Sequence, residues 1–278
     1  MLGRRLLTAA VGIPLLLGVL WAGHPWLGVL VAVVVLLAAV EMGELLDKAG
    51  YPVGHGVMVL LGVGAVAVAA ALPLAGQWLA GAWLVVAVGL AATVALRQPA
   101  PADGLRTLAG TLAGSALLAM LGLLLLIPLA ARPDSANGPL VAWLDAGRAW
   151  LLVIVLSVWA CDSAAYAIGR LWGRGRFFNH ISPSKTWSGA AGGALAATVA
   201  GGLLGWLIGQ PLIGLGLGVI VGFAAQAGDL VESMLKRAAG VKDSGRLFPG
   251  HGGMLDRVDA FMLVAPLAWL YLVVVGVA

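Results

Sequence analysis

The chain has 278 residues, of which 62% are hydrophobic and only 10% are charged. Soluble domains carry about 25% charged residues, so this composition, with a mean hydropathy of +1.04, excludes a soluble globular protein and predicts a polytopic membrane protein. One cysteine excludes an internal disulfide framework, and four scattered histidines exclude a Cys/His zinc site. The net charge of +4 comes without basic runs interleaved with aromatic residues, which argues against nucleic acid as a partner.

About nine apolar runs approach the roughly 20 residues that cross about 30 Å of hydrocarbon. Backbone groups in the bilayer core have no water to bind, and the runs are much longer than barrel strands, so they must be helices. We therefore predict an all-α fold with about nine transmembrane helices. It forms a single membrane domain, 1–278, with N-terminal apolar helices in 1–140 and catalytic helices with cytoplasmic polar loops in 150–278. The runs are centred near Leu16, Val34, Gly64, Val86, Leu121, Val155, Ala197, Gly218 and Leu267.

The distribution of Lys and Arg predicts the orientation. With a cytoplasmic N-terminus and nine spans, all 16 of these residues except Arg132 and Arg148 fall on the cytoplasmic side. Because cytoplasmic loops of membrane proteins are enriched in Lys and Arg, we predict N-in, C-out. Arg4 and Arg5 also fit the start of a signal peptide, but no clear small-residue cleavage site precedes His24, so we expect the first span to be retained.

Several apolar runs contain two glycines four residues apart, a spacing that lets helix backbones approach closely. Tight packing within one bundle is the simpler interpretation, and the alternative is the contact face of a homodimer. The pairs are Gly110/Gly114, Gly189/Gly193, Gly201/Gly205 and Gly218/Gly222.

Charged residues concentrate between Asp229 and Asp259. Ionisable groups cost about 2.5 to 3.5 kcal/mol each at mid-bilayer, so a membrane protein keeps them mainly where they line a polar cavity. The alternative is an ordinary solvated cytoplasmic loop. If the preceding helix continues, its polar residues fall at i, i+3, i+4 and i+7 and share one face. These residues are Asp229, Glu232, Ser233 and Lys236.

A second carboxylate pair, Asp256 and Asp259, opens the last apolar run. Carboxylate oxygens without Cys or His select hard cations, and Mg²⁺ usually leaves several positions for water and substrate phosphate. The two pairs therefore predict a site for Mg²⁺ and phosphate together. Between them lies a glycine-rich turn, 249–253, whose backbone N–H groups could approach an anion, although such a turn is more often only a tight turn.

A further polar segment includes Asp162 and Tyr166, inside an otherwise apolar run. An Asp in a membrane helix is a functional candidate, and the alternative is a buried partner for an Arg or Lys. After this run come Ser182, Lys185 and Thr186, which could donate hydrogen bonds to phosphate oxygens. The glycines of a P-loop are missing before them, so this segment is not a P-loop.

The stretch SMLKRAAGVKDSGRLFPGHGGMLDRVD, residues 233–259, resembles the signature of the phosphatidate cytidylyltransferases, also called CDP-diacylglycerol synthases. DSAAY (162–166) and SPSKTWSG (182–189) are similar to the other polar motifs of that family. The N-terminal half resembles it only in length and span pattern. Ala164, Ser184 and Ser188 depart from the family pattern, which puts the role of the second motif in doubt but not the reaction.

The resemblance implies that CTP and phosphatidate react to give CDP-diacylglycerol and pyrophosphate, with Mg²⁺ required. On this reading Asp229 and Asp256 hold the catalytic Mg²⁺, with Asp259 or Glu232 supporting a second cation. The catalytic set is then Asp229, Lys236, Asp256 and Asp259. The substrate-binding set is Ser182, Lys185, Thr186, Ser233, Arg237, Lys242, His251, Gly252, Gly253 and Arg257. Asp162 and Tyr166 form a polar site without an assigned step.

The location follows from the substrates, because phosphatidate stays in the bilayer while CTP is cytosolic. We expect the site to face the cytoplasm in the plasma membrane, and the excess of Arg over Lys with the Ala/Gly/Leu/Val bias suggests a bacterial source. The alternatives are another lipid head-group transferase or a polyprenol kinase-like enzyme, and less favoured, a membrane transporter. Among the lipid head-group transferases, a CDP-alcohol phosphotransferase would show a DGxxAR segment, which this sequence lacks. A transporter typically shows paired repeats with broken helices in both halves, whereas the polar groups here lie in the C-terminal half.

Overall fold

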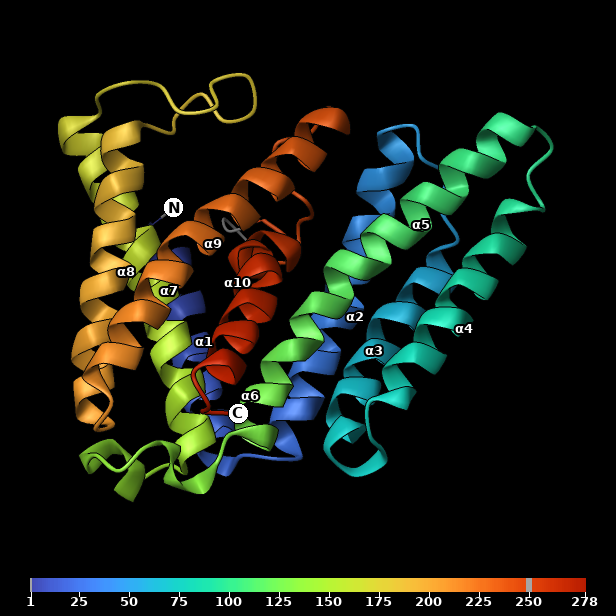
Figure 1. The fold of residues 1–278 in the computed structure, drawn as a ribbon. Helices are drawn as coiled ribbons and strands as arrows, with labels where there is room; N and C mark the ends of the chain where they lie inside the picture. The colour runs from blue at the N-terminus through green and yellow to red at the C-terminus, as the bar shows by residue number, and fades with distance from the viewer. Residues whose placement is uncertain (1, 249–251) are drawn as a thin grey trace. The chain divides into compact units, whose positions relative to one another are not determined.

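The computed structural model describes residues 2–248 and 252–278, with side chains from residue 10 onward. The described residues form helices joined by short loops, with two isolated β-bridges and no longer strand (Figure 1). The α-helices are α1 (Leu2–Ala22), α2 (Trp26–Lys48), α3 (His55–Ala75), α4 (Trp78–Ala95), α5 (Pro101–Gly122), α6 (Leu126–Ala130), α7 (Ala146–Trp172), α8 (Trp187–Leu207), α9 (Pro211–Ala238) and α10 (Leu255–Val274). Three short 3-10 helices are η1 (Leu123–Leu125), η2 (Pro133–Ser135) and η3 (Pro139–Ala142).

Within the described residues, 8 helices are long and apolar enough to cross a membrane, with Pro101–Ala130 counted as one span. This confirms the predicted all-α polytopic membrane fold. The remaining expected span, near Leu16, falls in α1, whose described apolar part, Ala10–Ala22, is shorter than the others. The side chains of Arg4 and Arg5 lie outside the described residues.

The chain forms two compact units, and neither is a continuous stretch of sequence. The first unit comprises residues 1–125 and 234–258, and the second comprises residues 126–233 and 259–278. The end of α9 and the start of α10 therefore belong with the N-terminal helices. The predicted separation into N-terminal apolar helices and C-terminal catalytic helices stays a prediction.

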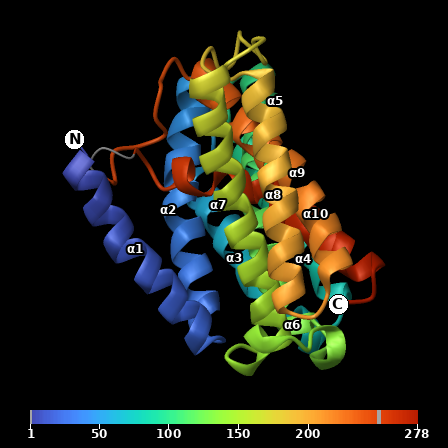
Figure 2. The same ribbon diagram turned by 90° about the vertical axis from the view of Figure 1, so that its left-hand side faces the viewer.

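In the first unit, α2, α3 and α5 pack against one another, and Figure 2 shows α1 meeting α2 at the turn that joins them and diverging from it toward the N-terminus. The predicted close approach at Gly114 occurs here, because a Cβ at this glycine would meet the side chains of Met42, Leu46 and Met58. Gly110 similarly faces Tyr51. This pair therefore serves packing inside the unit.

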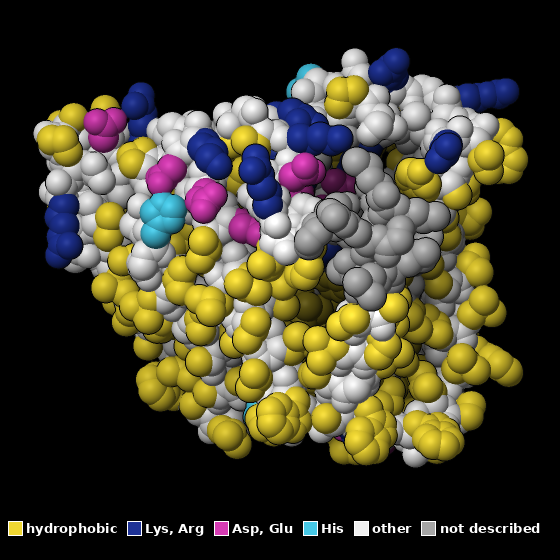
Figure 3. Space-filling model, turned by 180° about the vertical axis from the view of Figure 1, so that it is seen from behind, with side chains coloured by type: hydrophobic (Ala, Val, Ile, Leu, Met, Phe, Trp, Pro, Cys, Tyr) yellow, Lys and Arg dark blue, Asp and Glu magenta, His cyan; other side chains and the backbone are white. Residues whose placement is uncertain are grey.

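The first unit separates apolar from charged residues along its helices. The end of α2, the start of α3, the end of α4 and the start of α5 lie at the same end, where Gly54 approaches Val94 and Gly104 approaches Ala95. This end carries Lys48, Arg97 and Arg106. In the face that Figure 3 shows, hydrophobic side chains cover most of the surface, and most of the Lys, Arg, Asp and Glu side chains in view lie in its upper part.

In the second unit, glycines bring helix backbones together. A Cβ at Gly201 or Gly205 of α8 would collide with the backbone of Gly214 on α9, and a Cβ at Gly193 would meet the carbonyl oxygen of Cys161 on α7. Cys161 Sγ in turn donates to the Gly222 carbonyl oxygen at 3.8 Å. The predicted packing role of these glycines holds within the unit, and a homodimer stays a prediction.

The cations of the second unit lie at opposite ends of α7. Arg148 stands at its start and Arg170 near its end, and a helix of 27 residues is about 40 Å long at 1.5 Å per residue. The Arg132 backbone N–H donates to the Val277 carbonyl oxygen at 2.8 Å, so Arg132 and the C-terminus share one end. This agrees with the expected grouping of Arg132 with the C-terminus, while the choice of N-in, C-out stays a prediction.

Candidate active site

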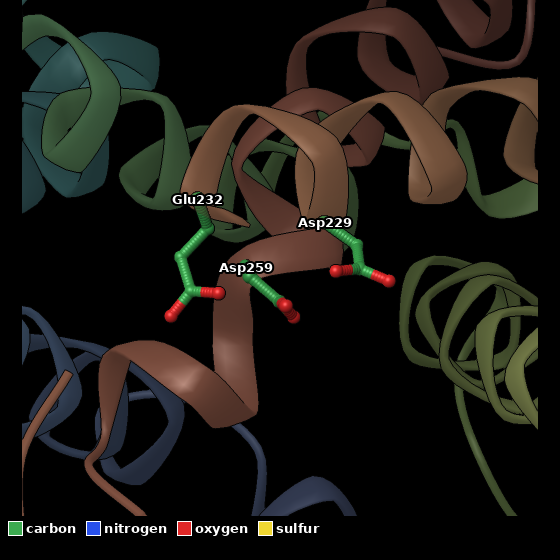
Figure 4. A group of neighbouring side chains, drawn as sticks. All are labelled: Asp229, Glu232 and Asp259. Carbon is green, nitrogen blue, oxygen red and sulfur yellow. The ribbon is translucent and has the colours of Figure 1, made fainter. Parts of the chain in front are cut away.

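Three acidic side chains of the second unit converge at the junction of α9 and α10. The carboxylates of Asp229, Glu232 and Asp259 each offer an oxygen, and these atoms lie within 4.8 Å of one another. Figure 4 shows the three carboxyl groups pointing to the same side of α9. Glu232 is fully buried, whereas Asp229 and Asp259 are partly accessible. The predicted i, i+3 spacing on a continuing helix therefore brings Asp229 and Glu232 together.

Gly228 explains how α10 comes close enough to add Asp259 to this group. Gly228 is buried, and a Cβ there would lie 2.5 Å from the Asp259 carbonyl oxygen and 3.1 Å from the Ala260 Cα. Only a residue without a side chain lets the two backbones approach this closely. The glycine directly before Asp229 thus sets the spacing of the acidic group.

Lys185 supplies a positive charge beside the acidic group. Its Nζ lies 2.5 Å from Asp229 Oδ2, and the lysine side chain is 20% exposed. Ser233 Oγ donates to the other carboxylate oxygen, Asp229 Oδ1, at 3.3 Å. The structure therefore brings together two predicted phosphate-binding residues and a predicted metal ligand.

The segment before α8 positions Lys185. Thr186 is the N-cap of α8, and its Oγ1 accepts a hydrogen bond from the Gly189 N–H at 3.1 Å, as capping hydroxyls typically do. The Lys185 backbone N–H donates to the Ser182 carbonyl oxygen at 3.2 Å, which closes a turn. Thr186 and Ser182 thus have local structural roles, and their predicted contacts with phosphate stay predictions.

Asp162 and Tyr166 lie on α7 and are both exposed. The Tyr166 hydroxyl accepts a hydrogen bond from Arg170 at 2.9 Å. The structure therefore gives Tyr166 a local partner on its own helix, and the predicted polar site stays a prediction.

Asp256 lies in the first unit, in a different set of polar contacts. Its Oδ1 accepts from Lys236 Nζ at 2.7 Å, and both side chains are nearly buried, with 7% and 12% exposed. Its Oδ2 accepts from the Ser244 N–H at 2.9 Å and the Gly253 N–H at 2.8 Å, and lies 2.8 Å from the Ser244 hydroxyl oxygen. The structure thus pairs two predicted catalytic residues, and the role of Asp256 as a Mg²⁺ ligand beside Asp229 stays a prediction.

The other predicted substrate-binding residues surround this pair in sequence. Arg237 donates to the Val241 carbonyl oxygen at 3.0 Å, and Lys242 and Arg257 are exposed. Gly252 has a φ of +81°, a conformation that favours glycine. His251 lies outside the described residues.

Sequence reasoning missed Glu41, the most heavily hydrogen-bonded acidic residue of α2. Its carboxylate accepts hydrogen bonds from the Met254 N–H and the Leu255 N–H of the signature segment, each at 2.8 Å, and its Oε2 lies 2.8 Å from the Ser244 hydroxyl oxygen. Glu41 is 9% exposed. The only sequence signal is that Glu41 is the first acidic residue after the apolar run of α2, and Glu44 and Asp47 follow it closely.

Gln226 was missed as well. It lies one helical turn before Asp229, and its side-chain amide donates to the Ala190 carbonyl oxygen on α8 at 3.1 Å and to the Gly222 carbonyl oxygen at 2.7 Å. The amide thus ties α9 to α8 just before the acidic group.

The chain is similar to a known protein family along almost its whole length. A family model described as the cytidylyltransferase family matches residues 3–275. The chain belongs to this family. The membership confirms the family predicted from the signature at 233–259.

Individual relatives match a shorter part of the chain. The phosphatidate cytidylyltransferase of Brucella suis biovar 1 is 47% identical over 134 residues, 45% of this chain and 47% of the relative. Those of Synechocystis and Mycobacterium bovis are 44% identical over 129 residues and 39% identical over 137 residues. These matches cover 44% of this chain and 44% of the Synechocystis relative, and 49% of this chain and 45% of the Mycobacterium relative. The matched region thus spans about half the length of these curated relatives.

Proposed function

We propose that this membrane protein transfers the cytidylyl group of CTP to phosphatidate, giving CDP-diacylglycerol and pyrophosphate. The observation that carries the proposal is the acidic group of Asp229, Glu232 and Asp259, with ligand oxygens within 4.8 Å of one another, in a chain of the cytidylyltransferase family. A hard-cation site at the end of membrane helices suits a reaction between a soluble triphosphate and a lipid phosphate.

Mg²⁺ is the cofactor that the donor set fits best. All three side chains offer carboxylate oxygens, the ligands that Mg²⁺ prefers, and two oxygens around one octahedral Mg²⁺ stand about 3 to 4 Å apart. Asp229 and Asp259 would hold the ion, in place of the pair Asp229 and Asp256 expected from the sequence, and Glu232 would support a second cation. Mg²⁺ held there would supply positive charge that offsets the negative charge of the phosphates of CTP and phosphatidate.

The reaction itself needs cations more than it needs a base. The phosphate of phosphatidate is already anionic near neutral pH, so one of its oxygens can attack the α-phosphorus of CTP while the bond to pyrophosphate breaks. Lys185, beside Asp229, would neutralise phosphate charge that develops at the acidic group. Lys236, held by Asp256, would do the same for the triphosphate, together with Arg237 and Lys242.

We place the reaction at the cytoplasmic leaflet of a bacterial plasma membrane. The supporting observations are that Lys48, Arg97 and Arg106 share one end of the first unit, that Arg170, Arg174 and Arg176 lie at or just after the end of α7 in the second unit, and that the matched relatives are bacterial. CTP would enter from the cytosol and phosphatidate from the bilayer.

The direct test is a turnover assay. Purified protein in lipid-containing micelles, given radiolabelled CTP, phosphatidate and Mg²⁺, should yield a labelled CDP-lipid and pyrophosphate in equal amounts. Omitting phosphatidate or Mg²⁺ should abolish the product. Correctly inserted protein that forms no CDP-lipid under these conditions would remove the proposal.

A further inference from the structure

Glu41 of α2 contacts the start of α10. Its partner Met254 lies 213 residues further along the sequence. Met254 directly precedes α10 and Leu255 is its first residue. Helix N-termini present N–H groups without an intrahelical acceptor, and a carboxylate there is stabilising because it accepts these hydrogen bonds and complements the helix dipole. Glu41 therefore caps α10 from another helix.

The same carboxylate is linked to Asp256 through one hydroxyl. Ser244 Oγ lies 2.8 Å from Glu41 Oε2 and 2.8 Å from Asp256 Oδ2. Ser244 is 4% exposed, so water does not compete strongly for these contacts. Glu41, Ser244 and Asp256 thus form one buried chain of polar contacts, which ends at Lys236 Nζ on Asp256 Oδ1.

Two glycines of the signature segment leave room for the Glu41 carboxylate. A Cβ at Gly245 would lie 2.5 Å from Glu41 Oε1, and a Cβ at Gly253 would collide with the same carboxylate. Neither Gly245 nor Gly253 has a positive φ, so the backbone conformation does not require glycine at either position. The close approach of the Glu41 carboxylate explains why neither position has a side chain. The signature segment is therefore shaped around a residue that lies outside it.

We propose that Glu41 is a positioning residue for the cytidylyl transfer: it fixes the first turn of α10 and, through Ser244, the orientation of the Asp256–Lys236 ion pair. This inference rests on the proposed function. Glu41 touches no substrate in this role, so its removal should affect the placement of Lys236 on the phosphates more than the initial binding of CTP. Small displacements of catalytic groups lower the rate of the chemical step, since that step depends on near-ideal geometry.

The test compares Glu41→Gln with Glu44→Gln in the full-length protein. Gln keeps the shape of Glu41, but its amide group presents a donor where the backbone N–H groups need an acceptor. Glu44 lies one turn further along α2, is 54% exposed and pairs only loosely with Lys48 at 3.7 Å, so it provides the matched control. The expected result for Glu41→Gln is a kcat about 10- to 100-fold lower, with the KM for CTP changed less than about threefold. Glu44→Gln should retain both values.

Hydrogen exchange of the peptide covering 252–258, measured without substrates, provides a readout that does not depend on turnover. Exchange in Glu41→Gln should be at least about tenfold faster than in the wild type, because the amide keeps only one acceptor oxygen and one of the two N–H groups, Met254 or Leu255, loses its acceptor. It should stay unchanged in Glu44→Gln. A wild type that makes no CDP-lipid would remove the proposed function while leaving this measurement able to test the contact itself.

Ser244→Ala provides a second test if the Glu41→Gln protein does not fold and cannot be purified. It removes the hydroxyl between the two carboxylates but leaves the contacts of Glu41 with the backbone of Met254 and Leu255. Its kcat should fall at least about tenfold with a nearly unchanged KM for CTP. Unchanged exchange in Glu41→Gln, or a wild-type kcat in either variant, would overturn the proposal.

Discussion

Asp259 is the residue through which α10 contributes to the acidic group. Its carboxylate lies beside those of Asp229 and Glu232, and Glu232 is fully buried. Closely spaced carboxylates repel one another unless a cation or hydrogen bonds compensate for their charge. The proposed Mg²⁺ site therefore makes a direct prediction for this side chain.

Replacing Asp259 by Asn should lower kcat by about 100-fold or more, because a neutral amide is a poorer ligand for the cation that stabilises transition-state charge. Binding of Mn²⁺, used as a spectroscopic substitute for Mg²⁺ without CTP or phosphatidate, should weaken in parallel. Asp134→Asn is the control, since Asp134 is 77% exposed and pairs with an exposed arginine. Undiminished Mn²⁺ binding in Asp259→Asn would contradict the metal assignment.

The sequence could identify the acidic residues but not their partners. Asp256 and Asp259 are spaced i, i+3, so helical periodicity places both on one face and cannot tell which joins Asp229. The spacing of Asp229 and Glu232 was more informative, because both lie on one helix whose continuation to Ala238 is observed. Lys185 was recognised as a phosphate contact, but its approach to Asp229 depends on the packing of separate helices, which local patterns do not encode.

Glu41 illustrates a larger gap in sequence reasoning. It stands near the end of an apolar helix with Glu44 and Asp47 close by, so it resembles an ordinary residue of a solvated helix end. Only its burial and its contacts with Ser244, more than 200 residues away, distinguish it. Long-range contacts of this kind leave no periodic signal in one sequence.

At the level of elements, the helices themselves were largely predictable. Long apolar runs have few alternatives in a bilayer, because helices satisfy their own backbone groups. Glycine spacing correctly indicated close helix packing, as at Gly201 against Gly214. Gly228 belongs to none of the predicted pairs of glycines spaced four residues apart, so its close contact with α10 was not predicted.

The backbone contact at Gly228 makes a prediction for the α9–α10 junction. Gly228→Ala should push α10 away from α9, destabilise the protein by about 1 to 3 kcal/mol through overpacking and lower kcat by roughly 100-fold. Thermal unfolding in detergent and initial rates measure the two effects.

Gly202→Ala provides the matched control on α8. A Cβ there would meet Leu215 only at an ordinary contact distance of 3.6 Å, and Ala is favoured over Gly in helices by up to about 1 kcal/mol. It should therefore be as stable as the wild type or slightly more stable. Equal behaviour of the two variants would show that the spacing at Gly228 is not critical.

At the level of the whole molecule, the positive-inside rule predicts the orientation. A cysteine introduced at Asp134 should react with a membrane-impermeant maleimide in intact spheroplasts, because this position falls on the predicted outer side. A cysteine at Asp243, in the expected cytoplasmic segment, should react only after permeabilisation. Both positions are exposed, and the native Cys161 is buried, which limits the background in both samples. The reverse labelling pattern would invert the predicted topology.

The capping of α10 by Glu41 also has a consequence for biosynthesis. Ribosomes add roughly 5 to 20 residues per second, so the 213 residues between Glu41 and Met254 take about 10 to 40 s to synthesise. During that interval α2 has already left the ribosome, while the donors that will surround its carboxylate do not yet exist. The first unit, though N-terminal by most of its residues, can reach its final form only after the insertion machinery has received almost the entire polypeptide.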